Sequence, residues 1–228
     1  MKIYVFVSAA IVGIALSGCG DNKKQLDVAK KIQEQIHATG CLITKGTFID
    51  RVKGKQQTIE LSFNGVNKSN LDDRIVSTSA LYFYQNDTPD IYKFDQIIVN
   101  ITDGSASFRK SYTLEDIKST ESLLKFPVSK FFKWYATDSI HYILDSRFPD
   151  SALYKIDSIM LSIDSSYGKI KNIGFAGWAF SFIKETHEPL ELFYVTALNG
   201  SYMTDYLVCI LPASKKIANI SILNNPHH

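Results

Sequence analysis

Residues 190–211, LELFYVTALNGSYMTDYLVCIL, carry the clearest fold signal in the chain. Asn199-Gly200 stands between two runs rich in aromatic and β-branched residues, and this dipeptide favours the two-residue turn of a β-hairpin. Similar apolar runs precede and follow this hairpin. The sequence therefore predicts four consecutive antiparallel strands over residues 170–182, 190–198, 202–211 and 216–223.

The segment before these strands has helical periodicity. Thr113 and Asp116 have the spacing of a capping box, which predicts that a helix begins at Leu114. Pro127 should interrupt it, because proline removes a helical hydrogen bond and clashes with the preceding turn. The sequence predicts three helices here: residues 114–127, residues 128–144, and a third that is capped by Ser151 and ends at Tyr167-Gly168.

The first half of the chain mixes helix and strand signals. A helix is expected over residues 24–38, strands over 41–52 and 57–63, and a hairpin over 94–101 and 105–112 around Asp103-Gly104. Residues 69–84 suit either a helix, with capping-box spacing at Ser69 and Asp72, or a strand. The order of elements predicts an α+β protein made of two small α+β domains. The expected boundaries are 25–113 for the N-terminal domain, 114–127 for a connecting helix, and 128–224 for the C-terminal domain.

The C-terminal segment resembles the nuclear transport factor 2-like, or cystatin-like, superfamily. The resemblance lies in the Ile143-Leu144-Asp145 helix end, the following helix that ends Ser165-Ser166-Tyr167-Gly168-Lys169, and the Asn199-Gly200 hairpin. It implies a curved antiparallel sheet of about four strands wrapped over helices into a cone. Members of this superfamily include both enzymes and binding modules, so the resemblance implies no particular function. Their catalytic Asp-His or Tyr-Asp pair finds no residue-by-residue match in this chain.

The N-terminus has the features of a signal peptide. Ile3 to Leu16 contain no charged residue, and this stretch is shorter than the roughly 20 residues that span a bilayer. It ends Leu16-Ser17-Gly18-Cys19, which resembles the lipobox of bacterial lipoproteins, of the kind found in the Bacteroidota. The resemblance implies cleavage before Cys19 and lipid on its thiol, with residues 1–18 as the signal peptide and 19–24 as a tether. Asp21 is followed by two lysines, which favours an outer-membrane anchor facing the periplasm.

Bulk composition excludes some classes of protein and leaves others open. The chain has 228 residues, 45% of them hydrophobic, so it can build a real core. Its net charge is +2 without a long basic run, which gives no support to nucleic-acid binding. Apart from Cys19, only Cys41 and Cys209 occur, both among apolar neighbours. Free buried thiols are favoured, although a disulfide is compatible with an oxidising compartment.

No residue pattern assembles a catalytic or metal site in the sequence. His187-Glu188 lies in a polar stretch before a proline, which is typical of a solvated turn. His141 is three residues from Asp138, a spacing that suits a surface hydrogen bond on a helix. His37 falls at a helix end, where a cation suits the helix dipole. We therefore expect no catalytic residue, no metal and no cofactor.

A pocket inside the C-terminal cone is the subtler expectation. Gly174, Ala176, Trp178, Phe180 and Phe182 alternate along one strand and should share one face. With aromatic residues on the neighbouring strands, they suggest an apolar pocket. Its candidate lining is Trp178, Phe180, Tyr194 and Tyr206. The alternative is that these side chains simply fill the core, and core packing is the favoured reading.

Asp150-Ser151-Ala152 resembles the O-glycosylation acceptor of Bacteroidota envelope proteins. The same Asp-Ser pairing is also ordinary helix-capping chemistry. Ser151 is therefore a candidate glycosylation site and a candidate helix cap.

The functional expectation is a membrane-anchored envelope lipoprotein that acts as a non-catalytic binding or assembly module. The membrane, through lipid on Cys19, and an envelope protein or polymer would be its partners. A small-molecule binding protein or enzyme with a pocket in the cone is the first alternative. The second alternative is an inhibitor or immunity-type lipoprotein.

Overall fold

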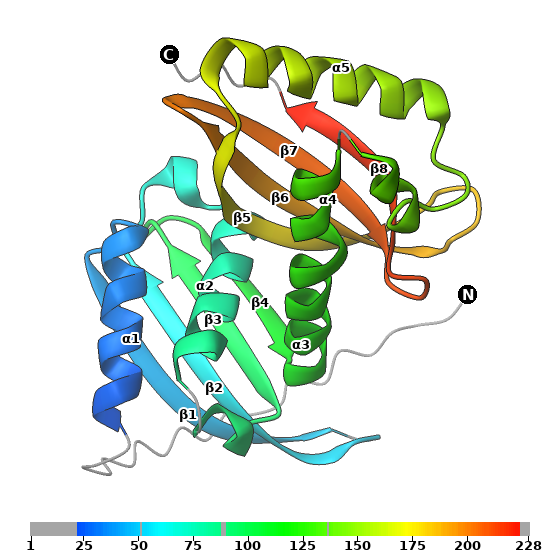
Figure 1. Cartoon of the computed structure of the whole chain (residues 1–228). Helices are drawn as coiled ribbons and strands as arrows, with labels where there is room; N and C mark the ends of the chain where they lie inside the picture. Colours follow the sequence, from blue (N-terminus) through cyan, green and yellow to red (C-terminus); the bar gives the residue numbers. More distant parts are fainter. Residues whose placement is uncertain (1–21, 51, 88–89, 136, 224–228) are drawn as a thin grey trace.

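The protein is an α+β structure with two four-stranded sheets, and the computed structural model describes residues 22–50, 52–87, 90–135 and 137–223. Figure 1 shows the first sheet below and the second above, with α2 and α3 between them. Residues 1–18, which are expected to form a signal peptide, and Cys19, the expected lipidation site, lie outside the described residues.

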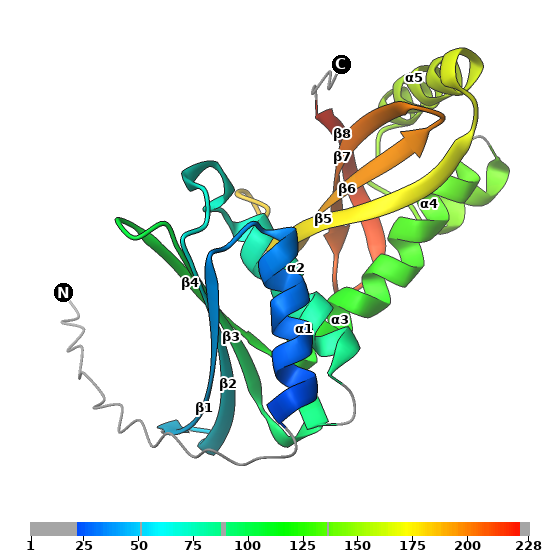
Figure 2. The same ribbon diagram turned by 90° about the vertical axis from the view of Figure 1, so that its left-hand side faces the viewer.

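The first sheet, sheet A, has the order β1-β2-β3-β4. Its strands are β1 (Gly40–Asp50), β2 (Gly54–Asn64), β3 (Gln96–Thr102) and β4 (Ser107–Thr113). β2 and β3 are parallel, and the connection between them carries η1 (Lys68–Asn70), α2 (Asp73–Asn86) and η2 (Asp90–Lys93). Together with α1 (Asn22–Gln35), α2 covers one face of the sheet (Figure 2). The other face is polar, and there Arg109 forms a two-pronged ion pair with Glu60.

The second sheet, sheet B, is an antiparallel meander in the order β5-β6-β7-β8. Its strands are β5 (Ile170–Phe182), β6 (Pro189–Asn199), β7 (Tyr202–Leu211) and β8 (Lys216–Leu223). They confirm the four strands expected from the sequence, including the turn at Asn199-Gly200, where Gly200 has a φ of 60°. A side chain at Gly200 would meet the carbonyl oxygen of Tyr167, so glycine is required there.

The helical segment between the sheets begins as expected and then departs from expectation. Its elements are α3 (Leu114–Leu123), the kinked segment η3 (Leu124–Val128), α4 (Ser129–Trp134), η4 (Asp138–Tyr142) and α5 (Asp150–Tyr167). Within η3, Phe126 is extended with φ −155° and ψ 122°, so the helix is interrupted just before Pro127, as expected. Thr113 caps α3 through the predicted capping box. The single helix expected over 128–144 is wrong. Thr137 is extended, with φ −135° and ψ 154°, and its hydroxyl donates to the Trp134 carbonyl oxygen at 3.0 Å. Such a side-chain bond competes with helix continuation.

Two predicted helix caps are corrected by the structure. The ambiguous stretch 69–84 contains the helix α2, but its N-cap is Asp72 and not Ser69. The Asp72 carboxylate accepts from the backbone N–H groups of Arg74 and Ile75. α5 is preceded by Pro149 as N-cap, without a side-chain cap bond, so Ser151 lies inside the first turn and does not cap it. The φ of Pro149, −70°, already suits a helix start.

The buried apolar side chains of both halves form one connected core. Trp178 of β5 packs against Tyr112 of β4, with ring centroids 5.0 Å apart. The expected boundaries at 113 and 128 are therefore crossed by side-chain contacts, and the division into two domains remains a prediction from the sequence.

Candidate functional site

The two sheets meet where α2 runs along β5. The Ser77 hydroxyl on α2 accepts a hydrogen bond from the backbone N–H of Trp178 at 2.9 Å. Gly177 lets the two backbones approach, because a Cβ there would lie 2.6 Å from the Arg74 Cα atom. The φ of Gly177 is 139°, a value that side chains rarely adopt. This contact fixes the first turn of α2 beside sheet B.

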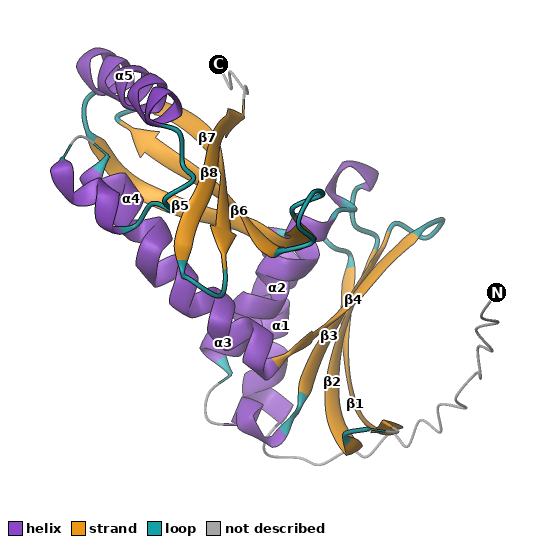
Figure 3. Cartoon of the chain, turned by 90° about the vertical axis from the view of Figure 1, so that its right-hand side faces the viewer, coloured by secondary structure: helices purple, strands orange, loops and turns teal. Residues whose placement is uncertain are grey.

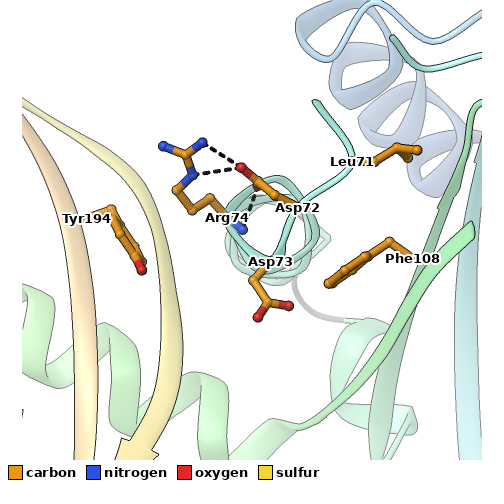
Figure 4. Close-up of a pocket in the computed structure, with 6 residues that line it drawn as sticks. All are labelled: Leu71, Asp72, Asp73, Arg74, Phe108 and Tyr194. Atoms are coloured by element: carbon orange, nitrogen blue, oxygen red, sulfur yellow. Dashed lines mark hydrogen bonds and ion pairs between the residues drawn. The ribbon is translucent and has the colours of Figure 1, made fainter. Parts of the chain in front are cut away.

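A shallow cavity of about 430 Å³ opens at this junction. Figure 4 shows its lining, which comes from the two residues before α2, the first turn of α2, β4 and β6: Leu71, Asp72, Asp73, Arg74, Phe108 and Tyr194. The Arg74 side chain lies on the side of Tyr194, while Phe108 and Leu71 lie on the opposite side of α2. We call it the junction cavity.

Ion pairs and cation–π contacts hold the charged side chains that line the junction cavity. The Arg74 guanidinium donates to the Asp72 carboxylate from Nε at 2.8 Å and from Nη2 at 2.6 Å. The guanidinium carbon also lies 5.8 Å from the centre of the Tyr194 ring, in a cation–π arrangement. On the other side, Asp73 forms an ion pair with Lys110, whose ammonium lies 5.8 Å from the centre of the Phe108 ring. Both carboxylates are thus held beside cations that rest on aromatic rings.

This arrangement suits binding and orientation of a ligand. The lining supplies two carboxylates, one guanidinium, a phenol and apolar side chains, without a nucleophile beside a base. Nearby, burial together with the Asp73 charge raises the pKa of Tyr112, so that phenol stays protonated at ordinary pH. The cavity can accept a group that exchanges places with one of the paired side chains.

The outer face of sheet B adjoins the junction cavity. Along β6, side chains alternate between buried ones and half-buried ones. α4 and α5 lie against one face of the sheet (Figure 3), and Tyr206 on that face packs against Phe132 of α4. The start of α2 approaches the other face at Gly177 and Tyr194, which are opposite each other in the strand pairing. That outer face carries the apolar side chains Leu190, Leu192, Tyr194, Leu198, Met203 and Leu207, with the hydrogen-bonded pair Thr196 and Asp205 among them. Apart from Met203, which is exposed, these apolar side chains are half-buried, and a partly exposed apolar sheet face can serve as a recognition surface.

The four candidate pocket residues occupy different environments. Trp178 is buried against Tyr112 and Phe175, and Tyr206 is buried with its ring 5.1 Å from that of Phe132. Phe180 is 54% exposed near the C-terminal end of β5. Tyr194 alone lines the junction cavity. Burial raises the pKa of Tyr206 to about 12.

A buried polar cluster that sequence reasoning missed ties α5 to sheet B. The Tyr135 hydroxyl donates to the Asp164 carboxylate, and the Asn199 amide donates to the other Asp164 oxygen at 2.8 Å and to the Gly168 carbonyl at 2.9 Å. Burial and the bond to Asp164 raise the pKa of Tyr135. No local signal marks these residues as partners, since they lie on three separate elements. Their bonds hold the end of α5 against the β6–β7 hairpin.

A second buried carboxyl lies between α3 and β6. Glu191 is almost fully buried, and its carboxyl accepts a hydrogen bond from the Thr120 hydroxyl at 3.2 Å. Burial raises the pKa of Glu191 to about 7, and the bond from Thr120 only partly opposes this shift. The bond between Thr120 and Glu191 joins α3 to sheet B, just as the bond between Ser77 and Trp178 joins α2 to it.

The histidines noted in the sequence lie in three separate places: an exposed loop, a short helix and the end of α1. His187 lies in the exposed β5–β6 loop at a φ of 58°, with its ring Nδ1 3.1 Å from the Lys184 carbonyl oxygen. Its neighbour Glu188 accepts from Arg147 at 2.8 Å. His141 and Asp138 share the short helix η4, and His37 follows the end of α1.

Among the described residues, neither the cysteines nor the metal-ligating side chains come together in a site. Cys41 and Cys209 are free thiols on different sheets, and burial raises the pKa of both. No group of three or more metal-ligating side chains comes together in the part of the chain that the structure describes. Ser151 is exposed, and its glycosylation stays a prediction.

Comparison with protein families, with curated proteins and with solved structures finds no match to this chain. Among the described residues, none of the helices has the length and hydropathy that a membrane-spanning helix requires.

Proposed function

We propose that this chain is a lipid-anchored protein of the bacterial envelope and that it works as a binding or assembly module. The lipobox Leu16-Ser17-Gly18-Cys19 supports the anchor, and the single Asp followed by two Lys favours the periplasmic face of the outer membrane. Two or three acyl chains on Cys19 would hold the protein stably, where one chain would not.

The observation that carries the binding role is the apolar outer face of sheet B. This face carries half-buried leucines at four positions of β6 and β7, and burying their remaining apolar surface against a partner would be favourable. The junction cavity at its edge adds charged and aromatic groups that can set specificity. The partner is an envelope protein or polymer that presents an apolar surface.

The finer classification is part of this proposal. We assign residues 128–224 to the nuclear transport factor 2-like, or cystatin-like, superfamily as a second domain. The helix, the break and the four-stranded meander support the assignment. Members of that superfamily include both enzymes and binding modules, so the proposed role does not rest on this assignment.

Photo-cross-linking in cells tests the binding role. A photoreactive amino acid at Leu192, on the outer face of sheet B, should yield a specific adduct. The same group at Ser111, on the polar face of sheet A, is the matched control and should yield none. Absence of an adduct from Leu192, or the same adducts from both positions, would contradict a binding role for this face.

The anchor is tested separately by metabolic labelling. Cells fed a labelled fatty acid should place the label on the wild-type protein and not on a Cys19→Ala variant. An unlabelled wild-type protein would contradict the lipoprotein assignment and would leave the cross-linking result standing.

A small-molecule ligand in the junction cavity is the second candidate function. An aromatic carboxylic acid could replace Asp72 on the Arg74 guanidinium while its ring contacts Tyr194 or Phe108. A panel of such acids should raise the melting temperature of the wild type and leave an Arg74→Ala variant unchanged. Arg109→Ala, which removes an exposed guanidinium elsewhere, should respond like the wild type. Equal responses of all three proteins would contradict this site.

A further inference from the structure

The β1–β2 hairpin projects beyond the rest of sheet A. β1 and β2 remain paired as far as Asp50 and Gly54, whereas β3 pairs with β2 only from Thr58 onward. In the outer part of the hairpin, residues 47–50 pair with residues 54–57, and no third strand lies beside them. These four residues of each strand extend the hairpin by about 13 Å. We call residues 47–50 and 52–57 the projecting ribbon.

The tip of the projecting ribbon carries two exposed apolar residues among charged ones. Ile49 is 83% exposed and Val52 is 93% exposed. Hairpin tips normally carry Gly, Asn, Asp, Ser or Pro, because these residues suit tight turns and water. Two β-branched apolar residues at such a tip give nothing to the core of the protein. Their placement leaves them available to an apolar environment outside the chain.

Cations accompany these apolar side chains. Lys53 and Lys55 are both exposed, and Lys55 lies directly opposite Ile49 in the strand pairing. Apolar side chains next to lysines are the combination that binds the surface of an anionic bilayer, because the lysines attract the headgroups while the apolar groups enter the acyl boundary.

The projecting ribbon also lies at the end of the molecule where the lipid anchor would be. Figures 1 and 2 place the first turn of α1 and the ribbon at the same lower end, opposite α5 and the upper part of sheet B. Cys19 is three residues ahead of Asn22, so covalent geometry keeps the two within about 10 Å of each other. This step rests on the proposed lipidation of Cys19.

We propose that the projecting ribbon is a second membrane contact. Ile49 and Val52 enter the interfacial region of an anionic bilayer, and Lys53 and Lys55 contact its phosphate groups. A flexible lipid tether alone would let the protein tumble. Two contacts at one end hold sheet A against the membrane and turn α5 away from it, so that the molecule presents a fixed side to partners.

Vesicle binding by a chain that starts at Gly20 tests the contact without any lipid anchor, and this chain retains every described element. Vesicles rich in phosphatidylglycerol should bind it, and pure phosphatidylcholine vesicles should bind it more weakly. Ile49→Ser and Val52→Ser should each weaken binding by about tenfold. Lys53→Gln with Lys55→Gln should remove the preference for anionic vesicles. Tyr154→Ser, which removes a 77% exposed aromatic side chain from α5, is the control and should change nothing.

Depth of insertion gives an independent readout. A Val52→Trp variant should show extra fluorescence that brominated lipids quench, whereas the extra fluorescence of Tyr154→Trp should not be quenched. Binding that is unchanged in the ribbon variants would overturn the proposal. So would a concentration-dependent dimer that Val52→Ser abolishes while vesicle binding persists, because the ribbon would then contact a second copy. A missing lipid on Cys19 would show in the labelling experiment and would leave the vesicle result unaffected.

Discussion

At the scale of single residues, Gly177 determines how closely α2 can approach sheet B. A Cβ at this position would lie 2.6 Å from the Cα and 2.8 Å from the carbonyl oxygen of Arg74. Because these are backbone atoms, relief requires the whole helix to shift. We expect Gly177→Ala to lower the free energy of unfolding by about 3 kcal/mol.

Gly174→Ala is the matched control for this prediction. It lies on the same strand, and the nearest atom to its added Cβ is 3.8 Å away. Its cost should stay below about 1 kcal/mol. Urea denaturation at equilibrium measures both variants, and equal losses would show that the approach of α2 does not depend on Gly177.

The buried Glu191 carboxyl should make the free energy of unfolding depend on pH. Burial raises the pKa of this carboxyl to about 7 from an ordinary value of 4.5. The folded protein therefore holds the proton more tightly than the unfolded chain. The stability that this group contributes is complete below pH 4.5 and is lost as pH rises to about 7, a loss of about 3 kcal/mol.

Glu191→Gln should remove that loss. The amide keeps the shape of the carboxylic acid and does not ionise, so the variant should be more stable than the wild type at pH 8. Urea denaturation at pH 5 and pH 8 measures the difference. Glu115→Gln, an exposed change on α3, should retain the wild-type slope. A Glu191→Gln variant that also keeps this slope would assign the pH dependence to other groups.

At the scale of elements, the start of α3 depends on one reciprocal cap. The Thr113 hydroxyl accepts from the Asp116 N–H, and the Asp116 carboxylate accepts from the Thr113 N–H, each at 3.1 Å. Thr113→Ala should cost about 1 kcal/mol. Ser151→Ala, in the first turn of α5 where no side chain caps the helix, should cost less than about 0.5 kcal/mol. Thermal unfolding compares the two, and equal shifts would contradict the assignment of caps.

Elements governed by local chemistry could be predicted from the sequence. The strands of sheet B and the turn at Asn199-Gly200 follow from alternation and turn residues, which are local signals. The strict alternation expected along β5 is wrong. A bulge between Phe175 and Gly177 shifts the register, so that Gly174 pairs with Thr196 and Trp178 with Phe193, on opposite faces.

Contacts between distant elements could not be predicted in this way. The junction cavity joins the start of α2 to Phe108 and Tyr194, which lie on different sheets. Single-sequence periodicity says which face of a strand is apolar and does not say which other element it will meet. For the same reason, periodicity could not predict the bond between Thr120 and Glu191, which are 71 positions apart.

At the scale of the whole molecule, the two sheets are tied by buried polar bonds and by aromatic packing. Thr120 binds Glu191, Ser77 binds the backbone of Trp178, and the Trp178 ring rests on Tyr112. Separating the halves would leave the Glu191 carboxyl and the Trp178 N–H without these partners and would expose a large aromatic side chain. Each lost partner of a buried group costs about 1–3 kcal/mol.

These ties predict that both sheets unfold together. In urea, tryptophan fluorescence follows Trp178 at the junction together with Trp134 of α4, whereas far-ultraviolet circular dichroism follows all the helices and strands. If the sheets unfold together, the two midpoints should coincide. Ser77→Ala removes the acceptor of the Trp178 N–H and should move both midpoints down by the same amount. Ser111→Ala, on the exposed face of sheet A, should move neither. Two separate transitions in the wild type would instead support independent domains at 25–113 and 128–224. A ribbon held at the membrane and an outer face of sheet B turned toward a partner need this coupling, because a hinge between the sheets would leave their relative direction undefined.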